Sequence, residues 1–374
     1  MIECYHQNML PMLRVLPINA KGGDDTLGYT ARRHRTLAWC GILIIALVLT
    51  MGAGIIAGPV YISLADTIRI LAHHLFGSSL TDTTQVTQDA IVWDIRVPRV
   101  LLGAAVGAGL ALAGVILQAL VRNMLADPYV LGVNSGASVG AAAAVLFGAG
   151  AGFGDYALQG SAFFGALTAS LLVFFIARGA GRLTSTRLLM SGVAVGYALS
   201  AATSFLVFAS DSAEGARSVM FWLLGSLGLA AWNGPLAVII VVVSAVSAVL
   251  MIWGRKLDAL TAGDETALTL GINPDRFRLI LLVVACMLVG VIVAMAGSIG
   301  FIGLVVPHLA RRIVGGAHRA VLPVSALIGA ILLIWADILA RTILAPQEMP
   351  IGIITALVGA PFLLILVRRM RATT

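Results

Sequence analysis

The chain has 374 residues, of which 60% are hydrophobic and only 11% are charged, and its formal net charge is +7 at pH 7. Ordinary soluble domains carry about a quarter charged residues, so this composition excludes a soluble globular protein and indicates a polytopic membrane protein. The net charge needs no nucleic acid partner, because basic residues at the cytoplasmic ends of membrane helices account for it.

Residues 1–36 precede the first apolar segment and are expected to form a cytoplasmic leader. Asp24 and Asp25 interrupt the apolar core that a signal peptide would need. The leader contains three methionines that leave the start codon open: Met1, Met9 and Met12.

Ten apolar segments follow and predict one all-α transmembrane domain of about ten helices over residues 37–370. A helix needs about 20 mainly apolar residues to cross about 30 Å of hydrocarbon. Since irregular backbone does not face lipid, we expect the segments to pack as helices, the short eighth one as a half-span. The segments are 37–57, 98–121, 129–150, 160–177, 188–209, 234–253, 279–297, 301–313, 321–343 and 350–367.

The second segment contains the run GAAVGAGLALAG, with four closely spaced glycines. Small residues let neighbouring membrane helices approach closely, so the run predicts tight packing. Glycine is also common in membrane helices in general, which is the alternative explanation for any single pair. The four are Gly103, Gly107, Gly109 and Gly114.

The basic residues orient the predicted bundle. If the N-terminus lies in the cytoplasm and the chain crosses ten times, 19 of the 24 lysines and arginines fall in cytoplasmic segments. Such an excess follows the positive-inside rule, so both termini, including the tail 371–374, are expected on the cytoplasmic side. The other five are Arg69, Arg96, Arg99, Arg217 and Arg341.

The predicted spans hold almost no ionisable side chains. Asp337 and Arg341, one helical turn apart, are the exception and can pair on one face. An ion-coupled transporter usually needs carboxylates at depth, so this scarcity disfavours a secondary transporter. A membrane-embedded enzyme is disfavoured because no Ser/His/Asp set or metal-ligand cluster lies at depth. The cysteines are too few and too scattered for a disulfide framework or a metal site: Cys4, Cys40 and Cys286.

The chain also lacks a loop that could bind ATP. A phosphate loop needs a lysine after glycine, and then a serine or threonine that holds magnesium. The two lysines, Lys21 and Lys256, are followed by Gly22 and Leu257. If ATP drives the protein, a separate subunit binds the ATP and its Mg²⁺, and this chain carries no cofactor of its own.

The cytoplasmic segment 255–278 contains the polar stretch GDETALTLGIN. It is longer than the roughly two to eight residues that commonly join packed helices, so we expect local structure. A capping box from Thr261 to Asp264 and a stop at Gly271 predict a helix over about 258–271. Such a helix has a small face that suits docking into a groove and a polar face; a solvated surface helix is the alternative. The small face holds Leu260, Gly263, Ala267 and Gly271, and the polar face holds Asp258, Glu265 and Thr269.

The stretch LTAGDETALTLGINPDRFR resembles the coupling helix of permeases from type II ABC importers, the FecCD family of iron-chelate, haem and cobalamin uptake. Three further stretches agree in order and spacing, so the resemblance covers about residues 60–370. They are IRVPRVLLGAAVGAGLALAGVILQALVRNMLADPYVLGVNSGASVG, GFIGLVVPHLARRIVG and ADILARTILAPQEMPIGIITALVGAPF. Met124 departs from the family, which usually has proline in this turn.

The resemblance implies the type II ABC importer permease fold. It also implies the membrane-spanning subunit of an ATP-driven importer for a ferric siderophore, with haem or cobalamin as alternative cargo, in the bacterial inner membrane. The implied partners are two copies of an ATP-binding cassette ATPase, a periplasmic or lipid-anchored substrate-binding protein, and a second permease, either identical or a close paralogue, in membrane lipid. The ATPase contact is expected at Gly263, Asp264, Glu265, Ala267, Leu268, Leu270 and Gly271.

In this family, carboxylates of the binding protein dock on arginines at the outer rim of the permease dimer. The matching positions are Arg96 and Arg99 in RVPR, and Arg341 in ADILAR. Guanidinium suits this role because it stays charged and can pair two N–H groups with a carboxylate. The alternatives are interfacial anchoring for the first two and an internal pair with Asp337 for Arg341. Changing Arg96 and Arg341 to glutamate is then expected to weaken docking without unfolding.

Polar residues in the third and fifth segments match the family's central channel and inner gate: Asn134, Ser135, Thr203 and Ser204. Hydrogen bonding between helices is their alternative role. Three histidines could be imagined as haem ligands, but each lacks a recognisable partner and is interpreted as a packed residue: His73, His74 and His308.

Overall fold

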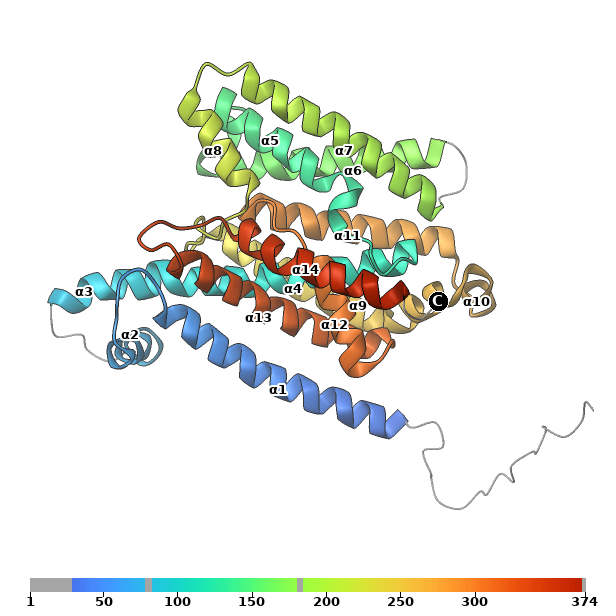
Figure 1. Ribbon diagram of the computed structural model, residues 1–374, viewed down its shortest axis with the longest axis horizontal. Helices are drawn as coiled ribbons and strands as arrows, with labels where there is room; N and C mark the ends of the chain where they lie inside the picture. The colour runs from blue at the N-terminus through green and yellow to red at the C-terminus, as the bar shows by residue number, and fades with distance from the viewer. Residues whose placement is uncertain (1–28, 78–82, 180–183, 372–374) are drawn as a thin grey trace, which may run out of the picture.

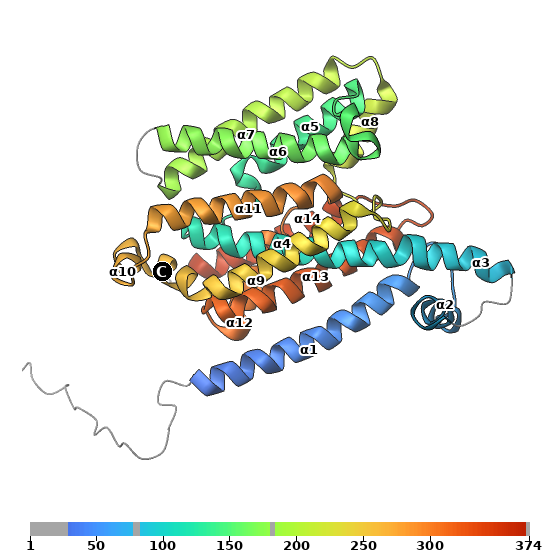
Figure 2. The same cartoon turned by 180° about the vertical axis from the view of Figure 1, so that it is seen from behind.

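The computed structural model describes residues 29–77, 83–179 and 184–371. Most of the predicted leader, Cys4 and the end of the tail lie outside these ranges. Within them the chain forms helices and no strands, which confirms the all-α prediction. The long helices lie side by side as one bundle (Figures 1 and 2).

Ten helices match the ten predicted segments: α1 (Tyr29–Ile56), α4 (Val97–Val121), α5 (Val133–Phe147), α6 (Ala157–Gly179), α7 (Ser185–Phe208), α9 (Gly234–Ala262), α11 (Pro274–Ala296), α12 (Ile302–Val314), α13 (His318–Thr342) and α14 (Ile351–Arg371). Seven spans in the described residues are long and apolar enough to cross a membrane, and α5 and α14 supply two shorter apolar helices. The 13 residues of α12 cover about 20 Å at 1.5 Å per residue. The prediction of an eighth half-span is therefore confirmed.

Shorter elements lie at the two ends of the bundle. The end with α2 (Leu64–Phe76), α3 (Thr83–Asp89), the π-helix η1 (Ala90–Arg96) and α8 (Ala213–Leu223) is called the α2 end. The opposite end, with α10 (Asp264–Thr269), is called the α10 end. Two 3-10 helices, η2 (Pro128–Leu131) and η3 (Ala151–Tyr156), flank α5. The predicted orientation places the α10 end in the cytoplasm.

Helix α4 forms the axis of the core. It packs against α9, α11, α12 and α13, and 78% of the apolar window of its span is buried, against 11% for α1. A Cβ atom added at Gly107 would meet the backbone of Gly329 in α13, and one at Gly114 would meet that of Gly303 in α12. The predicted close packing of α4 through its glycines is therefore confirmed at these two positions.

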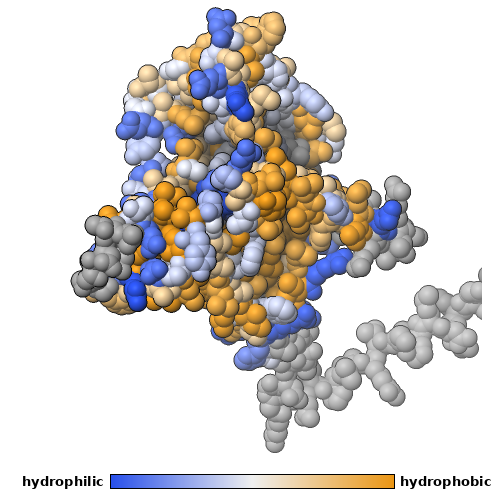
Figure 3. Space-filling view, turned by 60° about the vertical axis from the view of Figure 1, so that its left-hand side comes forward, coloured by the Kyte–Doolittle hydropathy of each residue, from blue (hydrophilic) through white to orange (hydrophobic). Residues whose placement is uncertain are grey.

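The flanks of the bundle are apolar. Large hydrophobic side chains are exposed along α1, α6, α7 and α14, including Leu49, Phe175, Phe205 and Leu364. Figure 3 shows hydrophobic residues over much of the visible face, interrupted by patches of hydrophilic residues. Surfaces of this kind face lipid, as expected for a multi-pass membrane protein.

Candidate functional site

The loop predicted to carry a coupling helix folds as the short helix α10 between two glycines. Gly263 adopts φ +141°, a conformation that favours glycine, and separates the end of α9 from the start of α10 at Asp264. Gly271 (φ +74°) donates its N–H to the carbonyl of Leu268 (2.9 Å). The predicted stop at Gly271 is therefore confirmed.

The predicted start of this helix and its capping box are wrong. Residues 258–262 belong to α9. The Thr261 hydroxyl donates to the carbonyls of Leu257 (3.1 Å) and Asp258 (2.8 Å). Thr261 thus lies inside the last turn of a helix instead of ahead of one, and Gly263 takes the N-terminal boundary of α10.

The carboxylate of Asp264 ties α10 to two spanning helices. Arg278 of α11 donates from Nη1 to Oδ2 (3.1 Å) and from Nη2 to Oδ1 (2.7 Å). Arg122, the left-handed C-cap residue of α4, donates from Nη2 to Oδ1 of Asp264 and from Nε to the Leu260 carbonyl (3.0 Å). We call Asp264, Arg122 and Arg278 the Asp264 clamp. It joins α10 to the ends of α4 and α11.

The charge of Asp264 is held by these arginines. Partial burial acts to raise the pKa of its carboxyl, but the hydrogen bonds and charges of Arg278 and Arg122 together outweigh it. The net result is a pKa below the ordinary carboxyl value. Asp264 is therefore ionised, and its ion pairs are formed, at physiological pH.

The two faces of α10 differ from those predicted. Ala267 and Leu260 of the predicted small face are fully buried, and α10 packs against this chain's own α9 and α11, whereas Gly271 of the same face is exposed. Leu268 is 56% exposed and Leu270 is 64% exposed. The surface that another protein could contact therefore includes these two leucines and the exposed residues Glu265, Thr266, Thr269 and Gly271.

At the α2 end, Arg96 and Arg341 bind the last carbonyl groups of α1. Each arginine is only 3% exposed. The end of a helix leaves its final carbonyls without partners in the helix, and here five guanidinium hydrogen bonds of 2.5–3.1 Å reach into that region. The acceptors are the carbonyls of Gly54, Ile55, Ile56, Ala57 and Val60.

Arg99 belongs to a buried ionic network with Asp337. Its Nε donates to Asp337 Oδ1 (2.9 Å), and its Nη1 donates to both carboxylate oxygens of Glu348 (3.0 Å). Arg341 Nε lies 2.9 Å from Asp337 Oδ2, which confirms the predicted internal pair. Sequence reasoning missed the partners of Arg99 because they lie 238 and 249 residues away along the chain.

These contacts change what substitutions of the arginines should do. Arg96, Arg99 and Arg341 are each no more than 6% exposed, so their guanidinium groups face the protein interior. A docking role for them stays a prediction. The expectation that glutamate at positions 96 and 341 spares the fold conflicts with this geometry. The substitutions would remove the hydrogen-bond donors of these carbonyls and place a carboxylate beside them.

The predicted pathway residues lie on two neighbouring helices. Asn134 and Ser135 are near the start of α5, and Ser135 faces Gly196 of α7. The Thr203 and Ser204 hydroxyls in α7 donate to backbone carbonyls four residues back (both 3.1 Å). Such bonds satisfy hydroxyls inside membrane helices, so the pathway role of these four residues stays a prediction.

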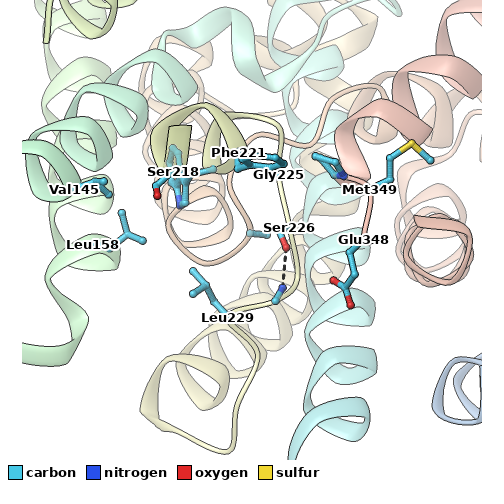
Figure 4. A pocket seen from close by; sticks show the side chains of 13 residues that line it. Val145, Leu158, Ser218, Phe221, Gly225, Ser226, Leu229, Glu348 and Met349 are labelled. Carbon is cyan, nitrogen blue, oxygen red and sulfur yellow. Dashed lines mark hydrogen bonds between the residues drawn. The ribbon is translucent and has the colours of Figure 1, made fainter. Parts of the chain in front are cut away.

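A cavity of about 370 Å³ lies near the α2 end, between α8 and the loops that precede α9 and α14 (Figure 4). Its wall mixes apolar side chains such as Leu229 and Met349 with the polar side chains of Ser218, Ser226 and Glu348. Non-helical backbone at membrane depth is tolerated where it lines a cavity. Sequence reasoning missed this cavity because separate loops and helices build it.

Each of the three histidines contacts a neighbouring ring, although His74 is exposed. His74 Nε2 lies 2.8 Å from Asp89 Oδ1, and its ring stacks on Trp93 with centroids 4.1 Å apart. His308 packs edge-on against Phe362. Across the described ranges, no group of three or more His, Cys, Asp or Glu residues is placed to hold a metal ion.

Comparison with known proteins places this arrangement among transporters. The sequence matches the FecCD transport family over residues 42–369. It is 47% identical over 304 residues to the cobalamin import system permease protein BtuC of Halobacterium salinarum, covering 81% of this chain and 79% of that protein. It is 43% identical over 291 residues to the hemin transport system permease protein HmuU of Yersinia pestis, covering 76% and 86%.

A solved structure has the same architecture. An ABC transporter of the metal-chelate type, in an inward-facing conformation, superimposes with a TM-score of 0.76 and 32% sequence identity. The match covers 88% of this chain and 98% of the solved chain.

Proposed function

This chain belongs to the FecCD transport family and is the permease subunit of a type II ABC importer, and from this premise we propose that it carries a ferric-siderophore-type iron chelate across the bacterial cytoplasmic membrane. The likeness to a metal-chelate type transporter supports this class of cargo. The names of the two relatives support cobalamin and haem as alternatives.

The observation that carries the proposed mechanism is the Asp264 clamp. Leu268 and Leu270 present an apolar surface at the α10 end, while Asp264 fastens the same helix to α4 and α11. In this proposal a separate ATPase subunit, which binds ATP and Mg²⁺, contacts the two leucines. Its movement passes through the clamp into α4, the most buried span, and so changes the packing of the bundle.

On the outer side, the proposed event is the docking of a substrate-binding protein at the α2 end. Arg99 is the most exposed of the three docking positions, at 6% against 3% for Arg96 and Arg341. Its partner Glu348 keeps 44% of its side chain exposed and lines the cavity. Arg96 and Arg341 would contribute by holding the end of α1 in place. The released cargo would enter the cavity and pass Asn134, Ser135, Thr203 and Ser204, with a second permease copy completing the channel.

The cargo can be tested by competition. The chain is reconstituted in liposomes with its cognate ATPase and binding protein, and uptake of a labelled ferric siderophore is measured against excess unlabelled siderophore, hemin or cobalamin. The proposal expects only the siderophore to compete. No uptake of the labelled siderophore, with ATP-driven uptake of labelled hemin or cobalamin in the same liposomes, would replace the cargo but leave the transport mechanism standing.

A further inference from the structure

Helix α2 has an apolar face that the described part of the chain does not cover. Thr67 and Ile70, which are 2% and 0% exposed, turn toward the bundle. Leu64, Ile68 and Leu75 are 57%, 57% and 65% exposed. At about 100° per residue, these three fall within about 40° of one another around the helix.

The polar side chains of α2 lie on the opposite side. Asp66, Arg69 and His73 are centred about 150° from the three exposed apolar residues. Such a division into a polar and an apolar face, with no apolar run long enough to cross a membrane, is typical of helices that lie in a membrane interface. Tyr61 precedes the helix and is 88% exposed, and tyrosine is enriched at membrane interfaces.

The position of α2 also fits an interface. Figures 1 and 2 show α2 end-on beside the end of α1, so it runs across the direction of the spanning helices. The 25 residues of the α1 span, Arg32–Ile56, cover about 37 Å, which exceeds a hydrocarbon core of about 30 Å. Arg32, Arg33 and Arg35 mark the opposite end of this span, so we expect Ile56 near the hydrocarbon boundary at this end. Helix α2 begins a few residues later at Leu64.

The other side of α2 is fixed to the bundle. His74 pairs with Asp89 (2.8 Å) and stacks on Trp93 of η1, which runs directly into α4. Both ends of α2 are capped, because the Ser63 hydroxyl accepts the N–H of Asp66 (3.1 Å) and Gly77 closes the helix with φ +75°. Helix α2 also contacts α1, which itself exposes large hydrophobic side chains such as Leu49.

From this geometry we infer that α2 is a membrane-interface helix, with Leu64, Ile68 and Leu75 inserted among lipid acyl chains and its polar face in the headgroup layer. The helix thereby fastens the α2 end of the bundle to the outer leaflet. This inference requires only that the chain spans a membrane, and it is independent of the cargo and of the ATPase.

The test places a nitroxide label on each face of α2. Cys4 and Cys40 are changed to serine and the buried Cys286 to alanine, and Ile68→Cys or the matched control Arg69→Cys is introduced into the full chain. Leu75→Cys serves as a second position on the apolar face. Each labelled protein is reconstituted in phosphatidylethanolamine and phosphatidylglycerol liposomes, and its collision rates with oxygen and with the water-soluble nickel complex NiEDDA are compared by power saturation.

The inference expects the labels at positions 68 and 75 to collide severalfold more with oxygen, relative to NiEDDA, than the label at position 69. Equal NiEDDA access at the two faces would overturn it. Protection at position 68 that appears only when the substrate-binding protein is added would also overturn it, because a protein would then cover this face. The chosen side chains are exposed, so labelling leaves the core packing unchanged, and gel filtration of each variant checks this.

Discussion

Asp337 is a buried carboxylate that neutralises two arginines from different parts of the bundle. Its oxygens lie 2.9 Å from Arg99 Nε and 2.9 Å from Arg341 Nε, and its side chain is 2% exposed. Arg341 in turn binds carbonyls at the end of α1. A single residue thus links α4 to α13 and, through Arg341, to the end of α1. Removing it leaves the buried Arg341 without its carboxylate partner and leaves Arg99 with Glu348 alone.

Asp337→Ala is expected to destabilise the protein by about 3–5 kcal/mol, the usual cost of removing one partner of a buried ion pair while the other charge stays buried. The measurement is the temperature at which the detergent-solubilised protein loses its monodisperse elution peak. The control is Glu348→Gln, which keeps an acceptor for Arg99 on a side chain that is 44% exposed. The same temperature shift in both variants would contradict this role of Asp337.

Asp264 sets the pH range of the clamp. Its pKa is lowered, so its contribution to stability is present above the unfolded-state pKa and is lost as the pH falls through the lower folded-state value. Because an ordinary aspartate has a pKa of about 3.9, the clamp should hold from about pH 8 to about pH 5. The number of ATP molecules hydrolysed per cargo molecule should then be constant over this range and should rise in Asp264→Asn at every pH. A rise in the unsubstituted protein near pH 5 would contradict the assignment.

At the scale of elements, continuous apolar runs locate helices well. The segment predicted over 98–121 is α4 at Val97–Val121, and the half-span predicted over 301–313 is α12. Short polar or amphipathic helices such as α2 and α8 are not predicted in this way, because they contain no long apolar run. The start of α10 could not be predicted either. That helix begins after Gly263, where Asp264 pairs with Arg122, a residue 142 positions away in the sequence.

The exposed and buried faces of α10 predict opposite outcomes for neighbouring substitutions. Leu268→Asp combined with Leu270→Asp changes only exposed side chains, so it should leave the thermal stability unchanged and abolish cargo uptake while the ATPase subunit still hydrolyses ATP. Ala267→Leu instead overpacks a fully buried position and should cost about 1–3 kcal/mol of stability. Uptake assays and thermal melts of both variants check this, and unimpaired uptake in the double aspartate variant would remove α10 from the coupling role.

For the whole molecule, the two ends of the bundle carry different features and one buried helix runs between them. The α2 end carries the cavity and the ionic network, the α10 end carries the clamp, and α4 connects them. The ten helices and the family were predictable, since they follow from apolar runs and local motifs. The partners of Arg99 and the cavity wall were not, because they form only when distant segments meet in the folded bundle.

The central claim is that ATP hydrolysis by a separate subunit acts on this permease through α10. The most direct test reconstitutes the chain with its cognate ATPase and binding protein in liposomes, and compares cargo uptake driven by ATP with uptake driven by an imposed proton gradient. We predict uptake that requires ATP, ignores the gradient and disappears in the variant with Leu268→Asp and Leu270→Asp. Uptake that follows the proton gradient without ATP would contradict the claim.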